Sequence, residues 1–233
     1  MSSQNEKESF ALLLDTRKAL EEMLHGAEKT QPDLRYDRKY IYLLAGFVFR
    51  AVDGYVLLRQ NGRVDASKLL IRPAMEAMFR GGSALNQPEI FFRIAYTELE
   101  SDLMWLRRAK SHDDDQSVSL DLSPREKSWQ RFEGDFKAQF PKLTPKKSPF
   151  GLEASANNAS MSGYYDTYYR LYCRYQHVAL AAIGQMLDQI TDAEDNRAMA
   201  LCTFSMADYL VHVGLPTPDG FDELKKRLEP PLG

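Results

Sequence analysis

Apolar residues recur every three to four positions along most of the chain, and this helical period limits the fold more than any other feature. No segment alternates apolar and polar residues convincingly, and no Asn-Gly turn joins two β-branched runs. The sequence therefore predicts an all-α protein without a sheet. We expect residues 1–233 to form a single domain, a bundle of seven or eight helices.

Capping residues, prolines and glycines divide this pattern into segments. The predicted helices cover about 4–26, 36–60, 63–85, 86–110, 123–140, 163–190, 192–213 and 221–228. Ser123 and Thr191 each begin a capping box that is completed by a glutamate three residues later. Pro73 falls inside the third predicted helix and should kink it. Residues 141–160 contain three prolines and form the longest irregular stretch, which we expect to be an excursion loop.

The composition indicates where the protein is located and which kinds of partner it can bind. The formal net charge is −3 and the pI is about 5.9, which argues against general DNA binding. The longest apolar stretch, residues 40–49, is about half the length of a membrane span, and the N-terminus is polar. Cys173 and Cys202 lie in apolar runs and should be buried, reduced thiols. We therefore expect a cytoplasmic protein without a membrane helix.

The sequence lacks the common cofactor and metal motifs. It has no phosphate loop, no dinucleotide-binding glycine pattern, no zinc-protease motif and no nucleophile elbow. Its four histidines are widely spread, and no two are four residues apart. We therefore expect no cofactor and no metal site.

Polar side chains form a narrow band on two otherwise apolar predicted helices. On 63–85 the band consists of Asp65, Lys68, Arg72, Glu76 and Ser83, and on 163–190 of Asp166, Arg170, Arg174, His177 and Asp188. Arg72 and Glu76 are four residues apart, so they can pair along the helix surface.

Three interpretations of these bands remain open. Both bands could face water as ordinary solvated surface. Arg72, Glu76 and His177 could instead meet inside the bundle as a satisfied polar cluster. The third interpretation is a site, because an arginine and a nearby histidine can hold a phosphate and move a proton. In such a site Tyr172 and its neighbouring tyrosines could stack on bases, and Arg174 could bind phosphate.

Two short motifs resemble known families. Residues 67–77, with Arg72 and Glu76, resemble the R-x-x-x-E helix of a mainly bacterial helical family catalogued as domain of unknown function 5677. The tyrosines and histidine of residues 168–177 resemble a later helix of that family, so the resemblance spans roughly residues 40 to 190. It implies a helical bundle without catalysis of its own, which binds a small ligand, RNA or protein partner in stress response or phage defence.

Residues 170–177 also resemble the signature of the HEPN superfamily, an arginine followed four to six residues later by a histidine. Six residues separate Arg170 from His177. This resemblance implies the alternative function, metal-independent RNA cleavage at a homodimer interface, with Arg170 and His177 as the catalytic pair. A homodimer is also expected because the apolar helices exceed what a thin bundle needs to bury.

Overall fold

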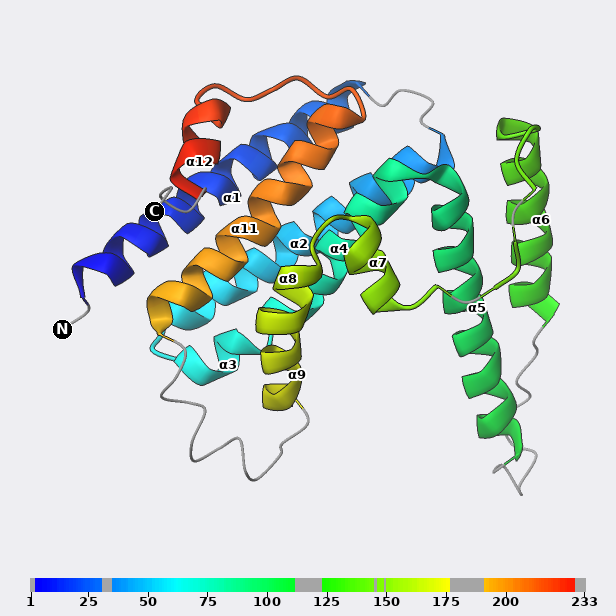
Figure 1. Ribbon diagram of the computed structural model, residues 1–233, viewed down its shortest axis with the longest axis horizontal. Coiled ribbons are helices and arrows are strands. Elements are labelled where there is room, and N and C mark those ends of the chain that lie inside the picture. Colours follow the sequence, from blue (N-terminus) through cyan, green and yellow to red (C-terminus); the bar gives the residue numbers. More distant parts are fainter. Residues whose placement is uncertain are drawn as a thin grey trace.

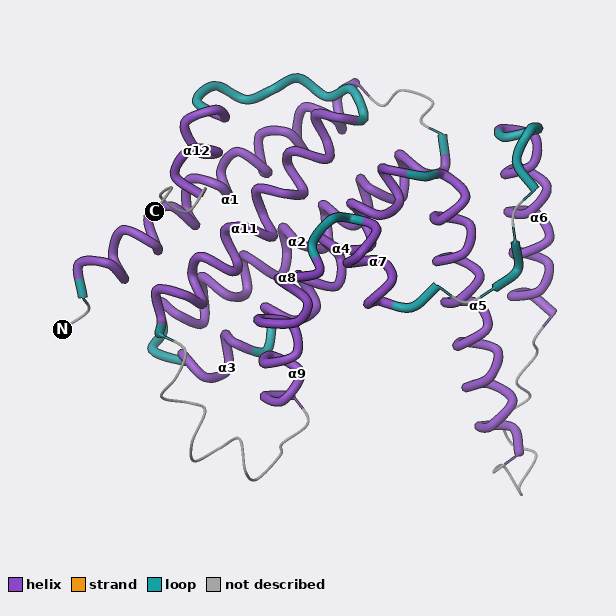
Figure 2. The backbone as a smooth tube through the Cα atoms, viewed as in Figure 1, coloured by secondary structure: helices purple, strands orange, loops and turns teal. Residues whose placement is uncertain are grey.

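The computed structural model describes residues 3–30, 35–111, 123–144, 146–148, 150–176 and 191–228. Its helices are α1 Gln4–Thr30, α2 Tyr36–Gln60, α3 Val64–Lys68, α4 Ile71–Asn86, α5 Pro88–Ser111, α6 Ser123–Gln139, α7 Leu152–Asn158, α8 Ser162–Tyr164, η1 Tyr165–Tyr169, α9 Arg170–Gln176, α11 Asp192–His212 and α12 Phe221–Leu228. Figure 2 shows helices and loops but no strand in these ranges. The predicted all-α class is confirmed.

Four long helices, α1, α2, α4 and α11, form the main bundle. Helix α11 contacts the other three, and it lies alongside α1 in Figure 1. The capping box at Thr191 begins α11: the Thr191 hydroxyl accepts from the Glu194 amide, and the Glu194 carboxylate accepts from the Thr191 amide. The centre of the main bundle is apolar, with fully buried Leu13, Leu20, Val52, Phe79, Met206 and Leu210. This burial, rather than local propensity, holds the helices together.

Helix α2 is the most apolar of the long helices. By length and composition alone it could cross a membrane. Here Ile41, Val48 and Tyr55 are buried inside the main bundle, and α2 contacts α4 and α11. Leu43 and Leu57, on its other side, are 67% and 61% exposed. Exposed apolar surface of this kind is compatible with an interface between two copies of the chain, so the homodimer stays a prediction.

The prediction of one continuous, kinked helix over residues 63–85 is wrong. The chain forms α3, leaves the helical path at Leu69 and Leu70, and starts again as α4. Pro73 therefore lies in the first turn of α4. A first-turn residue has no intrahelical partner for its amide, so proline costs little there.

The stretch 141–160 is only partly irregular, because it contains α7. Helix α7 packs on α4, with Ser155 and Ala156 buried. A Cβ atom on Gly82 of α4 would lie 2.5 Å from the Tyr209 hydroxyl and 3.0 Å from the Ala159 Cβ. Glycine at this position therefore lets the chain after α7 and α11 approach α4 closely.

Helices α5 and α6 form an antiparallel pair that stands apart from the main bundle, at the right of Figure 1. We call this pair the α5–α6 hairpin. Its core is made almost entirely of aromatic rings, and Ala84 of α4 and Tyr36 and Tyr40 of α2 also pack into it. The hairpin contributes Phe91, Phe92, Trp129, Phe132, Phe136 and Phe140. Ring centroids of Phe92 lie 5.0 Å from Phe136 and 5.2 Å from Trp129. Packing of this kind gives the α5–α6 hairpin a stability partly independent of the main bundle.

The helix predicted over residues 163–190 is interrupted near its start. Helix α8 passes into a π-helical turn, η1, before α9 begins at Arg170. Residues 177–190 lie outside the described residues. Of the two cysteines, Cys202 of α11 is buried as expected, whereas Cys173 of α9 is only partly buried.

Candidate functional site

The predicted pair of Arg72 and Glu76 is present and holds α4 against η1. The Arg72 Nε donates to the Glu76 Oε1 at 2.9 Å, and the Tyr169 hydroxyl donates to the same oxygen at 2.9 Å. The Arg72 guanidinium also lies 5.6 Å from the centre of the Tyr169 ring. Burial raises the pKa of the Tyr169 hydroxyl, which keeps it a hydrogen-bond donor at neutral pH. The side chains of Arg72 and Glu76 remain 22% and 28% exposed.

The other predicted site residues are less closely associated. Arg170 is on the surface, where its Nε lies 3.1 Å from Asp166 Oδ1 and its guanidinium covers the Tyr165 ring. Arg174 belongs to α9, but its side chain lies outside the described part of the structure, as does all of His177. The expected meeting of His177 with Arg72 and Glu76 therefore remains a prediction.

Four tyrosines of α8 and η1 form two stacked pairs. The rings of Tyr165 and Tyr169 are 5.0 Å apart with an 18° tilt, and those of Tyr164 and Tyr168 are 6.2 Å apart with a 27° tilt. The Arg170 guanidinium lies over the Tyr165 ring, and the Arg72 guanidinium lies over the Tyr169 ring. We call the four stacked rings of α8 and η1 the aromatic wall.

Tyr172 lies in the interior and does not face a ligand-accessible surface. It is fully buried, and its hydroxyl donates to Asp195 Oδ1 at 2.6 Å. The other Asp195 oxygen lies 3.3 Å from the Lys68 Nζ, and both of these side chains are buried. Burial raises the pKa of the Asp195 carboxyl, while the Tyr172 hydrogen bond and the Lys68 charge act in the opposite direction. The cluster therefore connects α3, α9 and α11 in the interior.

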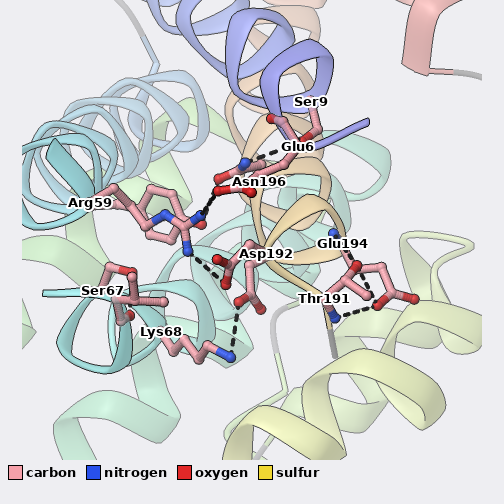
Figure 3. A network of polar contacts seen from close by, with 12 residues as sticks. Glu6, Ser9, Arg59, Ser67, Lys68, Thr191, Asp192, Glu194 and Asn196 are labelled. Carbon is pink, nitrogen blue, oxygen red and sulfur yellow. Dashed lines mark hydrogen bonds and ion pairs between the residues drawn. The ribbon is translucent and has the colours of Figure 1, made fainter. Parts of the chain in front are cut away.

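A second part of this network reaches α1 and α2. The Asn196 amide accepts from Tyr55 at 2.8 Å and donates to Ser9 at 3.1 Å. Nearby, the Arg59 guanidinium lies 3.2 Å from Glu6 and 2.9 Å from Asp192. Figure 3 shows Arg59 of α2 and Lys68 of α3 extending towards the start of α11, where Asp192 and Asn196 lie. Such a buried polar network fixes how the helices are arranged.

A cleft of about 430 Å³ opens beside the aromatic wall, between α1, α8–η1, α11 and α12. Apolar side chains from three of these elements and from α4 line it: Leu12, Met75, Ala198, Leu201 and Leu228. Tyr164 and Tyr168 of the stacked pair form one side. The volume is within the range of small-molecule sites.

Three charged residues also line this cleft: Glu194, Arg197 and Arg227. Glu194 is engaged in the α11 capping box, and Arg227 is paired with Asp15 at 2.7 Å. Arg197 differs, because it donates its hydrogen bond to a neutral group, the Asn5 amide oxygen, at 3.2 Å. In the part of the chain that the structure describes, no carboxylate forms an ion pair with the Arg197 guanidinium, which lines a largely apolar cleft.

Comparison with known sequences places the chain in a family. The profile described as a family of unknown function, DUF5677, matches residues 38–196. The chain belongs to DUF5677. Neither the curated proteins nor the solved structures include a significant match. The DUF5677 segment contains Arg72, Glu76, Lys68 and Asp195, whereas Arg197 of the cleft follows it.

Sequence reasoning missed most members of the buried network, among them Asp195 and Asn196. Both directly follow a capping box, so they resemble ordinary first-turn polar residues. A usable signal nevertheless exists. Asp195 shares the i, i+4, i+7 stripe of Met199 and Cys202, all three of them buried. A carboxylate on an apolar stripe predicts a buried cationic partner, and Lys68 fills that role.

Proposed function

We propose that this DUF5677 protein is a binding module, and that its cleft takes a small organic anion with a flat, apolar body. One observation carries the proposal: the Arg197 guanidinium lines a largely apolar cleft and has a neutral amide as its hydrogen-bond acceptor. A ligand carboxylate or phosphate would give this arginine an anionic partner, which it does not have among the described residues. The Tyr164–Tyr168 pair offers aromatic surface for the body of the ligand, and Leu12 and Leu201 offer apolar surface.

Calorimetry with 1-naphthylacetate and its neutral amide tests this proposal. We expect the acid to bind roughly ten- to a hundredfold more tightly than the amide, because a charge-assisted hydrogen bond contributes about 1.5–3 kcal/mol. Arg197→Gln should remove that preference and leave weak binding of both probes.

Arg107→Gln is the matched control, because Arg107 is an exposed arginine on α5, remote from the cleft. It should bind 1-naphthylacetate as the wild type does. Equal affinity for acid and amide in the wild-type protein would contradict the proposal, as would no binding of either probe at millimolar concentration.

The second candidate function is metal-independent RNA cleavage by Arg170 and His177. The exposure of Arg170 favours it: the side chain is 57% exposed, and Asp166 and the Tyr165 ring hold it at the surface. An oriented, accessible guanidinium can contact a phosphate and stabilise charge that develops on it.

Cleavage of a labelled single-stranded RNA in EDTA tests this candidate. We expect wild-type protein to cleave the RNA, and His177→Ala to be at least about 100-fold slower, as loss of general acid–base catalysis predicts. Arg170→Ala should also be slower, whereas Arg107→Ala should not. Equal cleavage by wild type and His177→Ala would exclude the catalytic pair.

A further inference from the structure

A groove of about 320 Å³ runs between α5 and α6, on the hairpin and away from the cleft. Tyr96, Leu99 and Leu103 line it from α5, and Trp129 lines it from α6. The α5 residues are three and four positions apart, so they lie along one helix face over two turns. The groove is therefore a shallow apolar channel parallel to two antiparallel helices.

The shape of this groove suits another helix. Two adjacent helices with side chains at i, i+3 and i+7 leave a furrow into which the ridge of a third helix packs. Figure 1 shows the α5–α6 hairpin standing away from the main bundle. A helix laid in the groove would convert the two-helix hairpin into a three-helix bundle.

The charges along the groove indicate what kind of helix fits. Three glutamates and one lysine line it, Glu100, Glu126, Glu133 and Lys147, which gives a net charge of −2. Lys147 lies 2.9 Å from Glu133, and its hydrogen bond lowers the pKa of the Glu133 carboxyl. Within the described ranges, no ion pair is present for Glu100, on one side of the groove, or for Glu126, on the other.

We propose that this groove binds a basic amphipathic helix of a partner protein. Leucine-like side chains of that helix would pack on Tyr96, Leu103 and Trp129, as in other helix-in-groove complexes. Lysines or arginines flanking its apolar face would pair with Glu100 and Glu126. An acidic or neutral helix would leave both glutamates unpaired at the edge of an apolar contact, so charge decides which partners bind.

Tryptophan fluorescence reports on this groove directly, because the chain has two tryptophans and Trp129 lines the groove. In Trp105→Phe protein, Trp129 is the single tryptophan. We titrate this protein with two 14-residue helical peptides, one of leucine and lysine and one of leucine and glutamate with the same apolar face. We expect the lysine peptide to shift the Trp129 emission to the blue with micromolar affinity, and the glutamate peptide to have no effect.

Glu100→Gln/Glu126→Gln should weaken binding of the lysine peptide at least fivefold in the same background. Glu8→Gln/Glu22→Gln is the matched control, because it changes the net charge equally on exposed residues of α1. Far-UV circular dichroism confirms that each variant is folded. Three results would each overturn the proposal: no response to the lysine peptide, an equal response to both peptides, or equal weakening in the two double variants.

Discussion

Lys68→Met should lower the free energy of unfolding by about 3–5 kcal/mol at neutral pH, the usual cost of leaving one member of a buried ion pair unpaired. Lys68 is 5% exposed and Asp195 is fully buried. Without the lysine, the Asp195 carboxylate keeps the Tyr172 hydrogen bond, and no other cation of the described residues forms an ion pair with it. Urea denaturation followed by circular dichroism measures the loss.

The loss of unfolding free energy in Lys68→Met should depend on the pH, and its direction follows from the pKa of Asp195. The folded-state pKa of Asp195 lies above its ordinary value of 3.8. A raised pKa means that the folded state holds the proton more tightly than the unfolded state. The Asp195 contribution to stability is therefore complete below about pH 3.8 and is lost as the pH rises through the folded-state pKa. Removal of Lys68 raises that folded-state pKa further, so the upper end of this pH range should move to higher pH while its lower end stays near pH 3.8.

The double variant Lys68→Met/Asp195→Asn provides the control. It removes both charges while the introduced amide can still accept from Tyr172, so most of the lost stability should return. Two results would show that the buried pair contributes little to stability. One is a loss of less than about 1 kcal/mol in Lys68→Met at neutral pH, which is well below the range for buried pairs. The other is a double variant that is no more stable than Lys68→Met.

Phe92→Ala should unfold the α5–α6 hairpin at lower urea concentration than the main bundle. Phe92 is fully buried among Trp129, Phe132 and Phe136. Loss of a buried phenylalanine costs about 3–5 kcal/mol, and here the cost falls on the small aromatic core. Both tryptophans, Trp105 and Trp129, belong to the hairpin. Tryptophan fluorescence should therefore change before circular dichroism at 222 nm does.

Phe79→Ala in the main bundle is the comparison. Phe79 is fully buried against Tyr165 and Tyr169, so its removal should weaken the whole protein and lower the circular dichroism midpoint. Phe92→Ala should leave that midpoint almost unchanged. Coincident fluorescence and circular dichroism transitions in Phe92→Ala would show instead that the hairpin and the main bundle unfold as one unit.

The sequence predicts the helices of this fold well and their contacts less well. Helix α2 has the expected ends, and the capping box at Thr191 is formed, because both depend on neighbouring residues. Pro73 indicated only a kink, whereas the helix breaks completely at Leu69 and Leu70. Helix α7 was missed because its packing on α4 supports it and no local pattern shows that packing. Of the candidate site, the i, i+4 spacing of Arg72 and Glu76 predicts their pairing. Their contact with Tyr169 depends on a helix far away in the sequence, and no local pattern indicates it.

The π-helical turn η1 lets this segment hold one residue more than an α-helix of the same span, because a π turn holds one residue more than an α-helical turn. Deletion of a single residue between Tyr165 and Tyr169 should therefore convert η1 into an α-helical turn and leave α9 in its present orientation. Tyr172 would then still reach Asp195. Deletion of Leu171, which lies in regular α-helix, would instead rotate Tyr172 by about 100° away from Asp195. Homologues that keep this network should therefore differ in length by one residue within η1 more readily than between η1 and Tyr172.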